Sequence, residues 1–239
     1  AALFTVFFLI ASVEARVIYV DSTASAGGDG TSWSSAFQYL QDALAQTTAG
    51  DEVWIAVGTY YPDEGAGITE GDRQASFTVN EGVTLIGGFA GGETLASQHD
   101  PEENATILSG EIWAEQLYWS LRVVTVTGSA TLDGLTITKG NANGDEAPLN
   151  QGGGVYATGD SSSVLTLNHC NFTDNSALRS GGAIYADSTR YTITADNATC
   201  SNNSAQHGGA IYGTFYSSVS ATDSTFTSNT AASSGGAIF

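Results

Sequence analysis

Methionine is absent from the 239 residues, and lysine and arginine together number only six against 25 aspartates and glutamates. The formal net charge is therefore −19. Binding to a nucleic-acid backbone requires lysine and arginine side chains, and anionic membranes and polyanionic substrates are repelled by so acidic a chain. We therefore expect no nucleic-acid partner. The polar residues are mainly serine, threonine, asparagine and glycine, which suits an extracellular β-protein.

Long hydrophobic runs are also lacking. The apolar run "AALFTVFFLI" covers residues 1–10, which is too short to span a bilayer as a helix. "VEA" follows at Val13–Ala15 and resembles a signal-peptidase cleavage site. We interpret residues 1–15 as the remnant of a secretory signal peptide, with a buried N-terminal strand as the alternative. We expect no membrane insertion elsewhere in the chain, which we interpret as truncated at its C-terminus.

Residues 16–50 predict a short strand at Val17–Val20 and one helix. Apolar residues recur at helical spacing over Ser34–Gln46, with Ser34 or Ser35 as a possible N-cap and Gly50 near the end. From Asp51 onward the pattern changes to short runs rich in valine, isoleucine, threonine and aromatic residues, separated by glycine and asparagine. Residues 51–239 are therefore predicted to be all β.

A repeated hexapeptide decides the architecture. "SGGAIY", "HGGAIY" and "SGGAIF" place the first glycines at Gly181, Gly208 and Gly235, with separations of 208−181 = 27 and 235−208 = 27. A 27-residue period is too short for a propeller blade, too regular for a sandwich, and carries no leucine or helical pattern. The period predicts a parallel β-helix with one coil per repeat. Each hexapeptide is then a corner and the strand after it.

Stacked coils place each residue type above its copy in the next coil, at about 4.8 Å. The three repeat coils can be aligned residue by residue if a one-residue gap is allowed in the middle coil. This alignment predicts a column of inward-pointing side chains and a ladder of asparagine side chains. The column consists of Phe172, Cys200 and Phe226, and the ladder of Asn175, Asn203 and Asn229.

The same alignment bears on the two cysteines, which could form a disulfide in a secreted chain. Cys170 aligns with Ala198 and Ser224, two residues out of register with Cys200. The resulting diagonal of about 8 Å exceeds the roughly 7 Å limit for a bridge. We predict two free thiols, unless a bulge shifts the coils.

"FTDN" at Phe172–Asn175 and "FTSN" at Phe226–Asn229, paired with the "GGAI" tetrapeptides, resemble the repeats of polymorphic outer-membrane proteins. The resemblance covers about Leu165–Phe239 and implies the right-handed β-helical passenger of a bacterial surface protein, chiefly known as adhesins and autotransporters. The N-terminal part is similar to the opening of secreted pectin-lyase-like β-helices. In those proteins a helix caps the open end of the solenoid.

No catalytic, cofactor-binding or metal-binding residue is predicted. The acidic stretches 63–73 and 143–151 are interpreted as solvated insertions, although a glycosidase would use two carboxylates about 5 to 9.5 Å apart. The three histidines are far apart in sequence and lack ligand partners at i+2 or i+4: His99, His169 and His207. His169, Asp196 and Asp223 could stack as a polar column, but the one-residue gap in the coil alignment breaks this column at Asp196. We interpret these positions as bends that face water. Five aromatic residues, Tyr60, Tyr61, Trp113, Tyr118 and Trp119, are interpreted as packing, with stacking on sugars as the alternative.

The sequence thus predicts a monomeric passenger, secreted or on the outer surface of a bacterium, that acts as an adhesin or structural protein. Its expected partners are carbohydrate or host cell-surface ligands, and no cofactor is expected. Two alternatives stay open. One is a carbohydrate-active enzyme of the pectin-lyase-like superfamily whose active site lies outside this sequence, and the other is an inert spacer.

Overall fold

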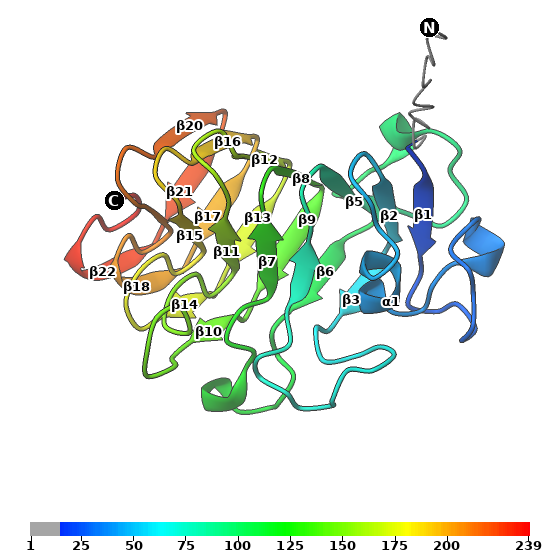
Figure 1. The fold of residues 1–239 in the computed structure, drawn as a ribbon, viewed down its shortest axis with the longest axis horizontal. Helices are drawn as coiled ribbons and strands as arrows, with labels where there is room; N and C mark the ends of the chain where they lie inside the picture. Colours follow the sequence, from blue (N-terminus) through cyan, green and yellow to red (C-terminus); the bar gives the residue numbers. More distant parts are fainter. Residues whose placement is uncertain (1–14) are drawn as a thin grey trace, which may run out of the picture.

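The computed structural model describes residues 15–239, so nearly all of the predicted signal peptide lies outside the described residues. The described strands form four all-parallel sheets, and successive coils lie side by side along the molecule from β1 to β22 (Figure 1). The fold is a parallel β-helix, as the 27-residue period predicts. Its right-handed sense stays a prediction from the crossover rule for parallel strands.

Each complete coil contributes one strand to each sheet. The seven-stranded sheet contains β1 (Val17–Val20), β2 (Glu52–Ala56), β5 (Val83–Phe89), β8 (Ala130–Asp133), β12 (Val164–Asn168), β16 (Thr192–Asp196) and β20 (Ser218–Thr222). The six-stranded sheet contains β3 (Gly58–Tyr60), β6 (Thr106–Ser109), β9 (Leu135–Thr138), β13 (Asn171–Thr173), β17 (Thr199–Ser201) and β21 (Thr225–Thr227).

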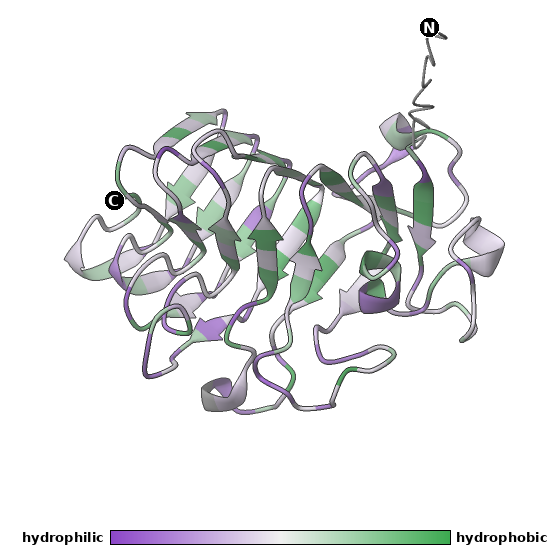
Figure 2. Cartoon of the chain, viewed as in Figure 1, coloured by the Kyte–Doolittle hydropathy of each residue, from purple (hydrophilic) through white to green (hydrophobic). Residues whose placement is uncertain are grey.

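Two smaller sheets complete the coils. The five-stranded sheet contains β4 (Phe77–Val79), β7 (Val124–Thr127), β11 (Val155–Thr158), β15 (Ile184–Asp187) and β19 (Ile211–Gly213). The four-stranded sheet contains β10 (Asn141–Ala142), β14 (Ser176–Ala177), β18 (Ser204–His207) and β22 (Thr230–Ser234). In Figure 2 the strands carry apolar residues in alternation with paler, polar ones.

The predicted inward column is confirmed. Phe172 pairs directly with Cys200, and Cys200 pairs with Phe226. The column continues through Ile137, Leu108 and Tyr60 in the preceding coils. Phe172 is fully buried and Cys200 is 2% exposed, whereas Phe226, on the edge strand β21, is only partly buried. Stacking of like positions therefore builds one continuous apolar core.

The two glycines of the repeated corner have different roles. Gly181 adopts φ +66°, a left-handed conformation that favours glycine. A Cβ on the next glycine, Gly182, would lie 2.3 Å from the carbonyl oxygen of Gly209 in the following coil. The first glycine is thus required by its dihedral angle and the second by the close approach of the neighbouring coil.

The predicted asparagine ladder is also confirmed. The side-chain amide of Asn175 donates to Oδ1 of Asn203 at 3.2 Å, and that of Asn203 donates to Oδ1 of Asn229 at 3.0 Å. Asn203 also donates to the carbonyl of Phe172 at 2.9 Å. The predicted one-residue gap lies where the register shifts between Ala205 and His207.

Both cysteines are free and buried, as predicted. Burial raises the pKa of each thiol to about 12, so neither is a thiolate at neutral pH. They act as small apolar residues of the core.

The predicted helix is shorter than Ser34–Gln46. It is divided into a 3₁₀ turn at Trp33–Ser35 and the α-helix α1 at Leu40–Leu44, whose N-cap is Tyr39 and not a serine. The physical reason is Phe37, which forms a parallel bridge with Val20 and exchanges backbone hydrogen bonds with the first strand. Tertiary pairing thus overrides helical periodicity. Two further 3₁₀ turns, Ala96–Gln98 and Gln116–Tyr118, depart from the all-β prediction for residues 51–239.

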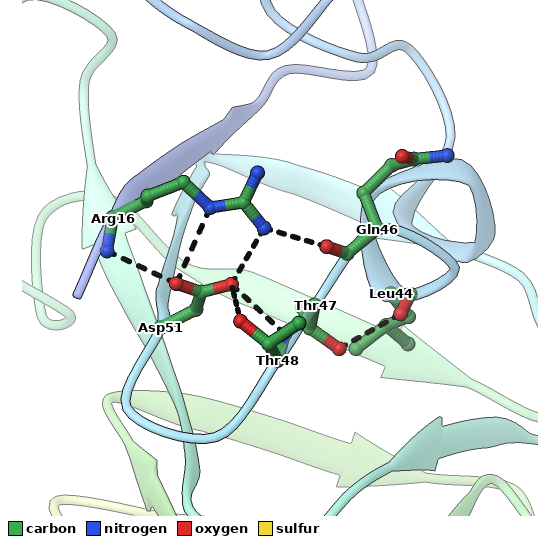
Figure 3. A network of polar contacts seen from close by, with 6 residues as sticks. All are labelled: Arg16, Leu44, Gln46, Thr47, Thr48 and Asp51. Carbon is green, nitrogen blue, oxygen red and sulfur yellow. Dashed lines mark hydrogen bonds and ion pairs between the residues drawn. The ribbon is translucent and has the colours of Figure 1, made fainter. Parts of the chain in front are cut away.

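The helix α1 packs against β1, β2 and β4, and its buried residues Leu40, Ala43 and Leu44 belong to the main core. The adjoining turn is fixed by the fully buried carboxylate of Asp51 (Figure 3). Asp51 accepts bonds from the backbone nitrogen and the guanidinium of Arg16, and from the backbone and hydroxyl of Thr48, at 2.7–3.4 Å. These bonds connect the start of β1 to the turn that precedes β2.

The early coils carry long insertions that the late coils lack. From β5 to β8 the first residues are 130−83 = 47 apart, whereas β12 to β16 and β16 to β20 are 192−164 = 28 and 218−192 = 26 apart. The insertions are residues 61–76 (β3–β4), 90–105 (β5–β6), 110–123 (β6–β7) and 143–154 (β10–β11).

Candidate functional site

Two grooves lie beside the insertions of the early coils. The first, named here the histidine groove, has a volume of about 850 Å³ and lies between the β5–β6 insertion and the bends after the strands of the seven-stranded sheet. Its polar lining consists of His99, Asp100, Glu102, Thr136, His169, Asn171, Asn197, Thr199 and Asp223.

The bends beside this groove share one backbone conformation. His169, Asn197 and Asp223 have φ values of +49°, +51° and +48°, and Gly134 occupies the same position one coil earlier with φ +65°. Asparagine and aspartate tolerate this left-handed region better than most residues. The column is therefore Gly134, His169, Asn197 and Asp223, so Asp196 is not a member, as the gap in the sequence alignment implied.

Three groups converge at one end of the histidine groove. One ligand atom each of His99, Asp133 and His169 lies within 4.8 Å of those of the other two. Nδ1 of His169 is 3.1 Å from Oδ1 of Asp133, and the imidazole rings of the two histidines have centroids 6.3 Å apart. Sequence reasoning separated these residues because His99 comes from an insertion and His169 from a bend two coils later.

His99 is held by neighbours on two sides. Its Nδ1 is 3.0 Å from the carbonyl oxygen of Gly87, and its ring packs 6.0 Å from that of Phe89. A carbonyl oxygen can only accept, so Nδ1 carries a proton and donates this bond. Phe89 belongs in turn to an aromatic cluster with Trp33 and Trp54 on the outer face of the seven-stranded sheet.

The second groove, named here the acidic groove, has a volume of about 510 Å³. It lies between the β3–β4 and β6–β7 insertions, and its lining combines carboxylates with aromatic rings: Tyr39, Tyr61, Asp63, Glu64, Glu70, Glu111 and Trp113. Trp113 is 54% exposed, and its Nε1 donates to the carbonyl of Gly71 at 3.4 Å, so the two insertions contact each other.

The carboxylates of the acidic groove differ in their surroundings. Asp63 is buried and accepts a bond from the backbone of Gly71 at 2.9 Å. Desolvation, followed by the negative charges of Asp63 and Glu70, raises the pKa of Glu64. The predicted "solvated insertion" at residues 63–73 thus includes a buried carboxylate and one wall of a groove.

The aromatic residues that the sequence singled out do not share one environment. Tyr60 is buried in the core column, and burial raises its pKa to about 12. Trp113 and Tyr118 are 54% and 48% exposed. Trp119 lies half-buried beneath the ammonium group of Lys139, which is 5.7 Å from the ring centroid. Packing therefore accounts for Tyr60 and Trp119, whereas Trp113 leaves a face open to a ligand.

Four of the six basic residues brace the early coils. Arg16 binds Asp51, and Lys139 forms an ion pair with Glu111. Arg73 connects three insertions, since its guanidinium donates to the carbonyl of Trp119 at 2.8 Å and to Oδ1 of Asn143 at 2.6 Å. Arg122 lies 4.4 Å over the ring of Tyr156. These cations have structural partners, which disfavours their use as a lyase base.

Within the described residues, no helix is both long enough and apolar enough to cross a bilayer. No curated protein and no solved structure matches the chain. Residues 169–187, 197–214 and 223–239 match the Chlamydia polymorphic membrane protein repeat. The matched segments include the bends, the asparagine ladder and the glycine corners described above. Proteins with this repeat are autotransporter passengers of the outer membrane and cell surface. The C-terminal region of this chain therefore carries three Chlamydia-type polymorphic membrane protein repeats.

Proposed function

We propose that this chain is part of a secreted passenger, displayed on the outer surface of a bacterium, that adheres to carbohydrate through the acidic groove. The repeats support the passenger role, and the acidic groove supports adhesion. The observation that carries the proposal is Trp113, an indole 54% exposed that lines the groove together with Tyr61 and four carboxylates. Exposed aromatic faces pack on the apolar faces of sugar rings, and carboxylates accept hydrogen bonds from sugar hydroxyls.

Charge narrows the ligand class. The groove presents Asp63, Glu64, Glu70 and Glu111, on a chain of net charge −19. Polyuronates and sulfated glycans would be repelled from such a surface, whereas neutral or amino sugars would not. We therefore propose a neutral or cationic glycan, such as those exposed on a host cell surface, bound by a monomeric chain.

Glycan-array binding tests this proposal. The protein should bind neutral or amino-sugar glycans, and Trp113→Ala and Tyr61→Ala should each weaken the binding at least tenfold because they remove a stacking face. Phe215→Ala is the matched control, since Phe215 is 84% exposed at the opposite end and lies outside the acidic groove. Thermal unfolding confirms that each variant is folded. Binding that survives both groove substitutions contradicts the proposal, and absence of binding favours the spacer alternative.

An enzyme is the second candidate because of Glu64. A carboxyl group with a raised pKa beside ionised carboxylates resembles the general acid of a glycosidase. We expect no turnover of polygalacturonate, alginate or xylan, since the braced cations disfavour a lyase base and the acidic surface repels the first two substrates. Xylan hydrolysis that is abolished by Glu64→Gln would favour the enzyme over the adhesin.

A further inference from the structure

We propose that His99, Asp133 and His169 form a binding site for a divalent first-row transition metal, with Zn²⁺ as the expected occupant. The site lies in the histidine groove and is separate from the acidic groove, so it does not depend on the proposed adhesion. Two imidazoles and one carboxylate are a ligand set that suits zinc, and three protein ligands leave one tetrahedral position open for water or a partner's side chain.

The spacing of the ligand atoms fits such an ion. Metal–nitrogen and metal–oxygen bonds of about 2.0–2.1 Å place two tetrahedral ligands about 3.3 Å apart. Nδ1 of His169 and Oδ1 of Asp133 are already 3.1 Å apart, and the ligand atom of His99 is within 4.8 Å of both. A movement of at most about 1.5 Å brings the third ligand to this separation. The His169 side chain is 49% exposed, and this exposure leaves room for the adjustment.

His99 is prepared as a ligand by its second hydrogen bond. Metal-binding histidines characteristically donate the other ring N–H to a carbonyl or carboxylate, which fixes the tautomer and the ring orientation. Nδ1 of His99 meets this condition through the carbonyl of Gly87 at 3.0 Å, and Phe89 supports the ring. Nε2 is therefore the ring nitrogen left to bind the ion.

The groove gives an ion access and a favourable charge. Asp100 and Glu102 line it beside His99, and Asp223 lines it along the column of bends. Their negative charges attract a cation, and the groove is open to solvent on the outer surface. When the ion binds Nδ1 of His169, it replaces the contact of this nitrogen with Asp133.

The test is calorimetric titration of the protein with Zn²⁺ in a buffer that does not bind metal, supported by the visible absorption spectrum of added Co²⁺. We expect one ion per chain. His99→Asn, His169→Asn and Asp133→Asn should each weaken Zn²⁺ binding at least tenfold. Asparagine suits these positions because its amide can still donate to Gly87, and because Asn197 occupies the bend equivalent to His169 in the next coil.

His207→Asn is the matched histidine control, because His207 lies in β18 outside this groove, and Asp174→Asn is the control for an exposed carboxylate in a left-handed bend. Both should bind Zn²⁺ as the unmodified protein does. Zn²⁺ should also raise the melting temperature of the unmodified protein but not of His99→Asn or His169→Asn. The proposed site would be overturned if the unmodified protein bound no Zn²⁺, or if His99→Asn and His169→Asn bound it as tightly as the unmodified protein. Loss of Zn²⁺ binding in His207→Asn would also overturn it.

Discussion

The early and late coils of this solenoid share the same sheets but are stabilised in different ways. From β11 onward, stability comes from repeated contacts: the core column, the asparagine ladder, and the rings of Tyr156, Tyr185 and Tyr212, which stack at centroid distances of 5.7 and 5.4 Å. Before β11 the core column continues, and contacts made once, such as those of Asp51 and Arg73, add to it. Repetition builds an even scaffold, whereas the single contacts support insertions that form grooves.

The largest expected effect lies within the repeated column. Phe172→Ala should destabilise the protein by about 3–5 kcal/mol, since it leaves a cavity in a fully buried site. Phe226→Ala should cost clearly less, because Phe226 is only partly buried on the edge strand. Urea unfolding measures both values. Equal costs at the two positions would contradict the difference in burial between Phe172 and Phe226.

The strongest single-copy contact is expected to be Asp51. Asp51→Asn should destabilise the protein by up to about 3 kcal/mol, because it removes the buried charge that accepts hydrogen bonds from Thr48 and from the half-exposed Arg16. Hydrogen bonds from Arg16 and Thr48 lower the folded-state pKa of Asp51, so this stabilisation is present above the unfolded pKa of about 4 and is lost as pH falls through the folded value.

The measurement is urea unfolding of both proteins between pH 6 and pH 3. The difference in free energy of unfolding should be constant above about pH 5 and should shrink toward pH 3. A difference that does not change with pH would mean that Asp51 titrates normally, against the arrangement in Figure 3.

The asparagine ladder should rank next. Asn203→Ala should cost about 2–3 kcal/mol, since it removes the side-chain acceptor of the buried Asn175 backbone N–H and a donor to the Phe172 carbonyl. Asn229→Ala, at the more exposed end of the ladder, should cost less. Thermal unfolding of the two variants checks the order, and a larger loss at Asn229 would contradict the ladder as described.

The smallest global effect is expected at Arg73. Arg73→Ala should lower stability by only about 1 kcal/mol, because Arg73 is half-buried and connects insertions that lie outside the core. Local opening should increase, however, since three insertions lose their shared partner. Limited proteolysis should then cleave residues 61–76 or 110–123 faster, while a Lys139→Ala control affects mainly the second. Unchanged cleavage rates in Arg73→Ala would contradict the role of Arg73 in holding the insertions together.

The late coils could be predicted from the sequence because each inward residue recurs in the neighbouring coil. The repeated positions of Phe172, Asn175 and the glycine pair predict the register, the free thiols and the ladder without any tertiary contact being known. The helix was predicted too long because helical spacing around Phe37 competes with its pairing to Val20, and periodicity contains no information on tertiary contacts.

The histidine cluster was only partly accessible to sequence reasoning. Aligning "LDGLTI" with "LNHCNF" would have placed Asp133 one coil before Asn168, the residue that precedes His169. His99 could not have been placed, since it lies in an insertion with no copy in another coil. The buried Asp51 has the same limitation. Residues that occur once are located by packing, and repeats do not indicate where they lie.

The central claim is that successive coils stack in register, and an engineered disulfide tests it most directly. Thr166 and Thr194 pair across β12 and β16, with their hydroxyl oxygens 3.3 Å apart. In a chain with Cys170→Ala and Cys200→Ala, Thr166→Cys with Thr194→Cys should form a bridge, since adjacent strands are about 4.8 Å apart. Thr166→Cys with Asp196→Cys, two residues farther along, should leave both thiols free. Mass spectrometry after alkylation reads the outcome: a bridge in the first pair alone supports the register, and a bridge in the second pair alone contradicts it.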